Sequence, residues 1–320
     1  MKHLFIVNPA AGKHDQTEEF TARIKAACEP WKLDYEIRVS SRKGNCTELA
    51  REAAQTGEAL RIYACGGDGT LNEVVCGVVG YPNAAVTHFP GGSGNDFIRI
   101  FDDPAAFRDL DRLLDPDEAE FDLIRVGELG YALNICSVGI DARVADLQSR
   151  CKRLPLITGS GAYNLALVRG VLGGVQRRYR VELDGKELDG QQSLICIANG
   201  RFYGGGWMPV PDAMPDDGML DVLIVKPVAL VTLLRVIGTY KHGGYRELPD
   251  FITHYRVREL RITSPNDRIV NADGEIMDAS EVCFSVAEEK LRFFYPKGLS
   301  YAVKSEANAS KEAQTSAIPV

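Results

Sequence analysis

The chain has 320 residues, 37 of them basic and 44 acidic, which gives a formal net charge of −7. This length can bury a large core and predicts two domains. The acidic balance argues against nucleic acid as a partner, because no excess of Lys and Arg is available to neutralise phosphates. The eight cysteines contain no CxxC pair, which indicates reduced core residues and excludes a disulfide or zinc framework.

Targeting signals are not evident from the sequence. The apolar segment at residues 1–7 is too short for a signal peptide. No run of about 18 apolar residues, the length of a membrane-spanning helix, occurs in the chain. We therefore expect a soluble, cytoplasmic protein.

The first 100 residues alternate apolar runs with amphipathic stretches, which predicts a parallel sheet with helices on its faces. Asn45 and Glu48 form a capping-box pattern at the start of the second helix. The predicted strands cover residues 4–7, 35–39, 60–65 and 84–89, and the predicted helices cover residues 17–28 and 45–57 and a stretch that begins near residue 71.

A glycine loop with an acid follows the third predicted strand, in Gly66-Gly67-Asp68-Gly69-Thr70-Leu71-Asn72-Glu73. A strand, a glycine loop and a helix start in this order point unpaired N–H groups at one place, where an anion binds well. Asp68 would repel a bare phosphate, which favours a bridging Mg²⁺. The alternative is a tight turn with a solvated Asp.

Similar loops follow the other predicted strands. Asn8-Pro9-Ala10-Ala11-Gly12-Lys13 follows the first strand, but His14 stands where a Walker loop has Ser or Thr. Ser40 follows the second strand. Pro90-Gly91-Gly92-Ser93-Gly94-Asn95-Asp96-Phe97 follows the fourth. Ligands of such sheets bind beyond the carboxyl ends of the strands, so these loops predict one composite site.

These motifs resemble the catalytic domain of diacylglycerol kinases, above all the soluble bacterial branch of that lipid-kinase family, which is related to sphingosine and ceramide kinases. The resemblance extends to Asn199–Gly206, Pro211–Ala213, Asp217–Val222 and Asp273-Gly274-Glu275. The matched stretches lie between residues 4 and 296 in family order. Ser40 and Ser93 stand where the family often has Thr, and either hydroxyl can donate to a phosphate.

Short β-rich runs predominate after residue 122 and favour an antiparallel sandwich. Strands are predicted at residues 123–126, 131–137, 179–183, 193–198, 220–225, 260–263, 268–271 and 282–286, and helices at 140–151, 162–172 and 228–239. The resemblance implies an NAD-kinase/diacylglycerol-kinase-like α/β nucleotide-binding domain at residues 1–122, which the chain rejoins at about 291–303. It also implies a β-sandwich lipid-substrate domain at residues 123–290. Residues 304–320 are predicted to be a disordered tail.

Phosphoryl transfer requires a held nucleotide, a metal and a base. Asp68 and Asp96 would hold the catalytic Mg²⁺. By resemblance Glu275 is the general base and Asp273 its nearest rival, whereas Asp273-Gly274-Glu275 alone would indicate a hairpin turn. The residues predicted to bind ATP are Asn8, Pro9, Ala10, Ala11, Gly12, Ser40, Gly66, Gly67, Asp68, Gly69, Thr70, Leu71, Asn72 and Ser93.

A second Mg²⁺, with a structural role, is implied by the resemblance at Asp217. Its ligands would be the Asp217 carboxylate and the backbone carbonyls of Met214 and Met219. Without the family, Asp217-Gly218 would indicate a plain turn.

Three basic clusters contrast with the acidic chain, and the default interpretation of each is a solvated surface. The alternative, which we favour for an enzyme without an anchor, is peripheral docking on anionic lipids. The clusters are Arg150, Lys152 and Arg153; Arg177, Arg178 and Arg180; and Lys241, His242 and Arg246. A homodimer is left open.

We therefore predict an ATP-dependent lipid kinase that transfers the γ-phosphoryl group to the hydroxyl of a diacylglycerol-like lipid in phospholipid metabolism. One alternative is a soluble-metabolite kinase of the NAD kinase type, and another is a kinase of sphingoid bases or other lipids. A non-catalytic regulator is disfavoured, because Asp68, Asp96, Asp273 and Glu275 are all present.

Overall fold

The N-terminal part of the chain builds one six-stranded sheet in the order β2-β1-β3-β4-β18-β5. The computed structural model describes residues 1–12, 14–92, 94–151 and 177–302. Neighbours from β2 to β18 run parallel, and β5 pairs antiparallel with β18 at one edge. The strands are β1 (Lys2–Val7), β2 (Tyr35–Val39), β3 (Leu60–Gly66), β4 (Ala84–Pro90), β5 (Pro116–Phe121) and β18 (Leu291–Pro296).

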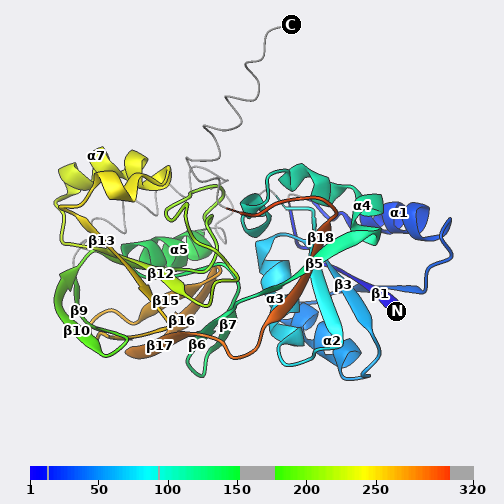
Figure 1. Ribbon diagram of the computed structural model, residues 1–320, viewed down its shortest axis with the longest axis horizontal. Helices are drawn as coiled ribbons and strands as arrows, with labels where there is room; N and C mark the ends of the chain where they lie inside the picture. Colours follow the sequence, from blue (N-terminus) through cyan, green and yellow to red (C-terminus); the bar gives the residue numbers. More distant parts are fainter. Residues whose placement is uncertain (13, 93, 152–176, 303–320) are drawn as a thin grey trace, which may run out of the picture.

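Helices cover this sheet, and its central strands are almost entirely buried, as expected for parallel strands packed on both faces (Figure 1). Strand β18 comes from the end of the described chain, and its Phe293 and Phe294 are fully buried in the first core. The helices are α1 (Thr17–Cys28), α2 (Asn45–Ala54), α3 (Asp68–Val78) and α4 (Leu110–Leu114), with short 3₁₀ turns η1 (Phe97–Ile100) and η2 (Pro104–Arg108).

The start of α2 is capped from α3, so the predicted capping box is wrong. The Glu73 carboxylate accepts the backbone N–H groups of Gly44 and Cys46 at 2.9 and 3.2 Å. The Asn45 side-chain oxygen instead accepts the N–H of Ser41 at 3.0 Å. Glu73 can reach the start of α2 because α2 and α3 pack closely. A Cβ on Gly77 of α3 would lie 2.6 Å from the Thr47 carbonyl oxygen of α2.

The second part of the chain is a sandwich of two antiparallel six-stranded sheets, which with the first sheet confirms the predicted fold class. One sheet has the order β10-β9-β14-β17-β6-β7 and the other β13-β12-β11-β8-β15-β16. Residues such as Tyr179 and Phe284 fill the space between them. The strands are β6 (Ile124–Val126), β7 (Gly130–Ala132), β8 (Ile135–Gly139), β9 (Arg177–Leu183), β10 (Lys186–Gln192), β11 (Leu194–Ala198), β12 (Leu220–Val225), β13 (Ile252–Val257), β14 (Glu259–Thr263), β15 (Ile269–Ala272), β16 (Glu275–Asp278) and β17 (Glu281–Val286).

Helices α5 (Ile140–Cys151) and α7 (Leu230–Lys241), with the turn η3 (Gly244–Glu247), pack on the outer face of the second of these sheets. The predicted helix at 162–172 and the predicted tail at 304–320 lie outside the described residues. The predicted change of domain near residue 122 falls between β5 and β6. There the buried carboxylate of Asp122 pairs with Lys290 and accepts the N–H of Gly218 at 2.8 Å.

The strand predicted at residues 131–137 is instead two strands in different sheets. Strand β7 ends at Ala132 in one sheet of the sandwich, and β8 begins at Ile135 in the other. The N–H groups of Leu133, Asn134 and Ile135 point to the Asp273 carboxylate, so the chain can change sheets without leaving these groups unpaired.

Candidate active site

The loops that follow the parallel strands meet at one edge of the first sheet, because the carboxyl ends of parallel strands lie together. The loop after β4 touches the loop after β3: the Gly91 N–H donates to the Gly66 carbonyl at 2.7 Å. A Cβ on Gly92 would lie 2.9 Å from the Gly67 Cα. The glycines therefore allow two backbones to approach more closely than side chains would permit.

Most of the predicted ATP-binding residues lie on these loops. Asn8, directly after β1, donates from Nδ2 to the Thr70 hydroxyl at 2.9 Å, and its Oδ1 accepts the Ala10 N–H at 3.0 Å. Ser40, directly after β2, is buried, and its N–H donates to the Val7 carbonyl at 2.9 Å. These contacts bind three loops together. Ser93 and Lys13 lie outside the described residues.

Asp68, the first residue of α3, and Asp96, directly before η1, form a pair of acids, of which Asp96 is buried and Asp68 half-buried. The Asp96 N–H donates to Asp68 Oδ1 at 2.5 Å, and the Gly205 N–H of the second domain donates to Asp96 Oδ2 at 2.7 Å. Asp96 Oδ1 has no hydrogen-bond partner among the described residues, although Arg99 Nε lies 3.2 Å away. Burial and the neighbouring Asp68 charge raise the pKa of Asp96 to about 6, and burial also raises the pKa of Asp68.

This pair fits a divalent cation, because two carboxylates that share a site repel each other and carboxylate oxygens suit a hard cation. In the described part of the chain, no cluster of three or more His, Cys, Asp or Glu side chains is suited to hold a metal. A cation bound at Asp68 and Asp96 would therefore take its remaining ligands from water and phosphate oxygens.

Asp273 faces the same place from the second domain but is held differently. It lies in a two-residue hairpin turn between β15 and β16, in which Asp273 and Gly274 have φ of 49° and 89°. Its carboxylate accepts the N–H groups of Leu133 at 2.6 Å, Asn134 at 3.0 Å and Ile135 at 2.8 Å. Burial raises the pKa of Asp273 to about 6, against the effect of these hydrogen bonds. Both carboxylate oxygens are already occupied by donors.

Glu275, two residues further on, is separate from this group. It is the first residue of β16, and its Oε2 lies 2.5 Å from Nζ of Lys43, which belongs to the loop between β2 and α2. The ion pair therefore joins the two domains. Both side chains are partly or largely exposed to solvent.

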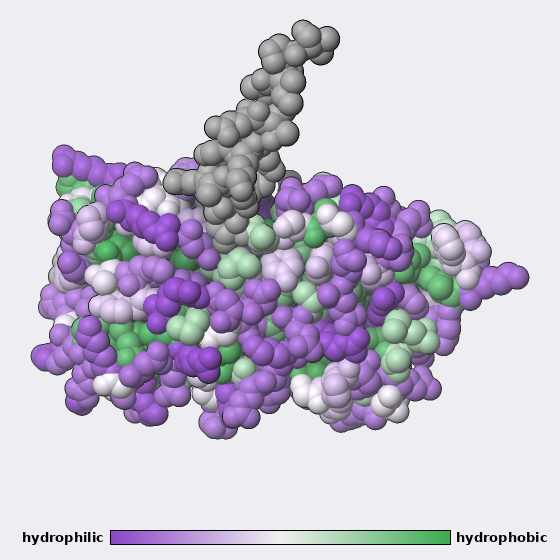
Figure 2. Space-filling view, in the orientation of Figure 1, coloured by the Kyte–Doolittle hydropathy of each residue, from purple (hydrophilic) through white to green (hydrophobic). Residues whose placement is uncertain are grey.

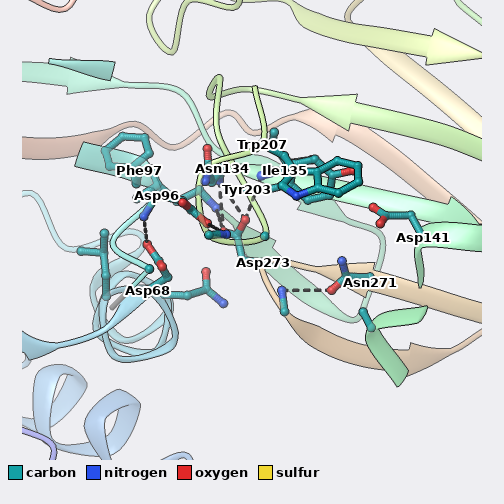
Figure 3. A pocket seen from close by; sticks show the side chains of 18 of the residues that line it. Asp68, Asp96, Phe97, Asn134, Ile135, Asp141, Tyr203, Trp207, Asn271 and Asp273 are labelled. Carbon is teal, nitrogen blue, oxygen red and sulfur yellow. Dashed lines mark hydrogen bonds between the residues drawn. The ribbon is translucent and has the colours of Figure 1, made fainter. Parts of the chain in front are cut away.

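A cavity of about 430 Å³ lies between the two domains and collects three of the four predicted catalytic acids, Asp68, Asp96 and Asp273 (Figure 3). Glu275 is not among the residues that line it. Of the residues predicted to bind ATP, it contains Asp68, Leu71 and Asn72. The second-domain wall is formed by Leu133, Asn134, Ile135, Asp141, Val144, Ala145, Tyr203, Gly204, Gly205, Trp207, Asn271, Asp273 and Gly274.

Five polar or aromatic side chains of this wall were not predicted as site residues, although one of them, Tyr203, lies in the quoted stretch Asn199–Gly206: Asn134, Asp141, Tyr203, Trp207 and Asn271. A local signal existed for Asp141. It follows the apolar strand at 135–139 and opens a helix, which is the same strand-to-helix pattern that identified Asp68.

Comparison with known proteins accounts for nearly the whole described chain. Residues 2–136 match the diacylglycerol kinase catalytic domain, and residues 134–295 match the YegS C-terminal NAD kinase beta sandwich-like domain. The chain belongs to the diacylglycerol kinase family of lipid kinases. Family membership makes it a kinase, and therefore a phosphotransferase.

The relatives of this family member are similar over most of their length. A Staphylococcus epidermidis protein named “Putative lipid kinase” is 27% identical over 82% of this chain and 85% of its own. A Staphylococcus carnosus protein of the same name is 23% identical over 82% and 86%. A crystal structure of a “putative diacylglycerol kinase” from Bacillus anthracis has a TM-score of 0.71 at 22% identity and covers 92% of this chain and 98% of its own. That similarity supports the fold.

The loop predicted to bind a structural Mg²⁺ gives a less favourable fit than the cavity. Asp217 Oδ1 accepts the Met219 N–H at 3.0 Å, and Oδ2 pairs with Arg256. The Met214 sulfur accepts a hydrogen bond from Arg201 at 3.1 Å. Both oxygens of the carboxylate have partners, so a cation here would have to displace the Arg256 guanidinium, and we assign it no part in the reaction.

The basic clusters of this lipid-kinase family member are largely paired with acids where the structure describes them. Arg178 pairs with Asp189 and Arg180 with Glu187 across the β9–β10 hairpin, at 2.7 and 3.0 Å. Arg246 pairs with Asp212 at 2.8 Å. The side chains of the cluster at 150–153 lie outside the described residues. Membrane docking through these clusters stays a prediction.

In Figure 2 hydrophilic residues cover most of the visible described surface, and hydrophobic ones are scattered among them. Within residues 1–151 and 177–302, apart from positions 13 and 93, no helix is long and apolar enough to span a bilayer.

Proposed function

We propose that the protein transfers the γ-phosphoryl group of ATP to the hydroxyl of a diacylglycerol-like lipid. The observation that supports this most strongly is the meeting of acids from both domains in one cavity with a partly apolar second-domain wall. Ile135, Val144, Ala145 and Trp207 provide apolar surface in that wall. Such a wall would give the apolar part of a lipid a surface to pack against.

The nucleotide phosphates would lie over the loops at the edge of the first sheet. The start of α3 supplies N–H groups and the positive end of a helix dipole to the phosphates. Asp68 and Asp96 would hold the divalent cation, which the family resemblance predicts to be Mg²⁺. When bound, this cation neutralises negative charge on the phosphates during transfer.

In the transfer itself, the lipid hydroxyl oxygen forms a bond to the γ-phosphorus. The bond from that phosphorus to the β–γ bridging oxygen breaks, and its electron pair leaves with ADP. The hydroxyl proton passes to a base, for which Glu275 is our choice. Asp273 is the poorer choice, because its carboxylate already accepts N–H groups from three residues.

Glu275 can act as this base only if it is freed from Lys43. The pair is solvent-exposed, with exposed fractions of 77% for the Lys43 side chain and 36% for that of Glu275. Exposed pairs of this kind contribute about 0–1 kcal/mol. Separation of Glu275 from Lys43 would therefore cost little electrostatic free energy.

The direct test is transfer of labelled phosphate from ATP, with Mg²⁺, to a panel of acceptors. The panel contains diacylglycerol and sphingosine in mixed micelles, and NAD in solution. We expect labelled lipid phosphate from the wild type and none from Asp68→Asn. Asp189→Asn, the same chemical change on exposed strand β10, should behave as the wild type. Transfer to NAD and to no lipid would overturn the proposal.

A further inference from the structure

The cavity contains a half-buried acid, with a buried Oδ2, to which the proposed reaction assigns no role. Asp141 lies in the first turn of α5, and its Oδ2 has no hydrogen-bond partner among the described residues. The hydroxyls of Ser137 and Tyr203 stabilise its charged form, but burial has the larger effect and raises the pKa of Asp141 to about 6. A buried acceptor oxygen without a donor is costly, so such atoms are uncommon unless a ligand or water completes them.

Asp141 is well placed to meet an acceptor molecule. In Figure 3 it lies at the second-domain end of the cavity, with Trp207 and Asp273 drawn between it and Asp68. Apolar side chains of Val144, Ala145 and Ile135 line the same wall. A headgroup with its reacting hydroxyl near the acids at one end would extend along this wall toward Asp141.

We propose that Asp141 accepts a hydrogen bond from a second donor on the lipid headgroup, next to the hydroxyl that is phosphorylated. This inference rests on the proposed function and narrows its substrate class. The preferred acceptor is an amphiphile with a hydroxyl or ammonium group beside the reacting hydroxyl, such as a monoacylglycerol or a long-chain amino alcohol. Diacylglycerol has no such donor, because its two other oxygens are esterified.

A matched set of three acceptors tests this assignment. All three have a three-carbon backbone with the same alkyl ether at one end and the same reacting primary hydroxyl at the other. They differ only in the group at the middle carbon. That group is a hydroxyl, an ammonium or a methyl ether. We expect kcat/KM of the wild type to be at least about tenfold higher for one or both donor-bearing acceptors than for the methyl ether, because the ether leaves the buried oxygen unpaired.

Substitutions at Asp141 should remove the preference without removing transfer. In Asp141→Ala, the ratio of kcat/KM for a donor-bearing acceptor to kcat/KM for the methyl ether should be close to one. Asp141→Asn keeps an acceptor oxygen but loses the charge, so it should retain the preference for the hydroxyl and lose that for the ammonium. This difference tells which donor the site takes, and it serves as the test if Asp141→Ala does not fold. Asp189→Asn should keep both ratios at the wild-type value.

The possible results separate this inference from the proposed function. If diacylglycerol and all three ethers react equally in the wild type, or if Asp141→Ala keeps the preference, the role of Asp141 is wrong and the lipid kinase stands. If no lipid is phosphorylated, the proposed function fails. In that case, fluorescence of Trp207 in a Trp31→Phe background measures binding of the three acceptors directly. Equal affinities for all three would also overturn the proposed role of Asp141.

Discussion

The same dipeptide, Asp-Gly, occurs on both sides of the cavity and has a different role in each place. Asp68-Gly69 opens helix α3, and Asp68 receives the N–H of Asp96 while facing a second carboxylate. Asp273-Gly274 forms the β15–β16 turn, and Asp273 receives the N–H groups of three residues from the β7–β8 junction. Both residues are half-buried, and desolvation raises the pKa of both carboxylates.

The difference lies in the neighbours of each carboxylate, because backbone N–H groups reach both acids but only Asp68 is paired with a second acid, Asp96. Asp68 and Asp96 lie beside each other, with Arg99 as a cationic neighbour 3.2 Å from Asp96 Oδ1, and a divalent cation would offset the repulsion between the two carboxylates. Asp273 has its hydrogen-bonding capacity filled by the backbone, so it stabilises the fold of the strand junction. The surroundings therefore predict a metal ligand at Asp68 and a structural group at Asp273, and mutation can test each side of the comparison.

The largest effect is expected at Asp68. In Asp68→Asn the site loses one of two carboxylates that would hold the cation, which supplies several kcal/mol of charge stabilisation to the transition state. We expect phosphoryl transfer to fall by about 10⁴-fold or more, with thermal unfolding close to that of the wild type. Near-normal turnover would show that Asp68 is not a metal ligand.

The next effect concerns Glu275, which lies next to the Asp273 turn but outside the cavity lining. Glu275→Gln keeps the shape of the side chain and cannot take a proton, so kcat should fall by about 10²–10⁴ with little change in nucleotide affinity. Lys43→Met removes the partner of Glu275 and should change kcat by less than about fivefold, since the exposed pair is weak. An active Glu275→Gln enzyme would move the base to another acid.

The sequence predicted the first-domain side of this comparison better than the second. The loops around Asp68 and Asp96 follow apolar strands directly, so local pattern was sufficient to place them together. The partners of the second-domain acids are distant in sequence: Lys43 and Glu275 are 232 residues apart, and Leu133 and Asp273 are 140 apart. No local signal carries such a contact.

Strands without an apolar pattern were missed for a related reason. Strand β10 has the sequence KELDGQQ, and β5 has PDEAEF, both at sheet edges where one side of the strand meets solvent. Their polar residues resemble loops, and it is the pairing with β9 and β18 that makes them strands. β-Propensity depends on such context, so the residue types alone do not identify these strands.

A moderate effect on stability is expected at Asp273. In Asp273→Asn one oxygen becomes an amide that faces N–H donors, so the charged acceptor of three residues is lost. We expect a loss of about 2–3 kcal/mol, measured as a fall of roughly 5–10 °C in Tm. Asp278→Asn is the matched control, because that acid lies at the exposed end of the same hairpin and pairs with Arg268. Equal Tm values for the two variants would contradict the structural role.

The smallest effect is expected at another Asp-Gly, Asp217-Gly218, whose carboxylate is partly exposed and paired with Arg256. Asp217→Asn alone should cost no more than about 1 kcal/mol. The family resemblance predicts Mg²⁺ at this loop, and here Arg256 would compete with it for the carboxylate. A cation that binds only the folded state raises the free energy of unfolding by roughly 1 kcal/mol when free Mg²⁺ is about five times its Kd. Loss of Arg256 should therefore increase the stabilisation by Mg²⁺, and loss of the Asp217 carboxylate should decrease it.

Melting curves with and without Mg²⁺ in three proteins resolve this question. Arg256→Met frees the Asp217 carboxylate, so its Mg²⁺-dependent rise in Tm should exceed that of the wild type. Asp217→Asn should show a smaller rise than either, with only the contribution of cation bound at Asp68 and Asp96. If the Mg²⁺-dependent rise in Tm is the same in all three proteins, Asp217 binds no cation and is a turn residue held by Arg256. Asp217 would then differ from Asp68 because its carboxylate is already paired with a guanidinium in the fold.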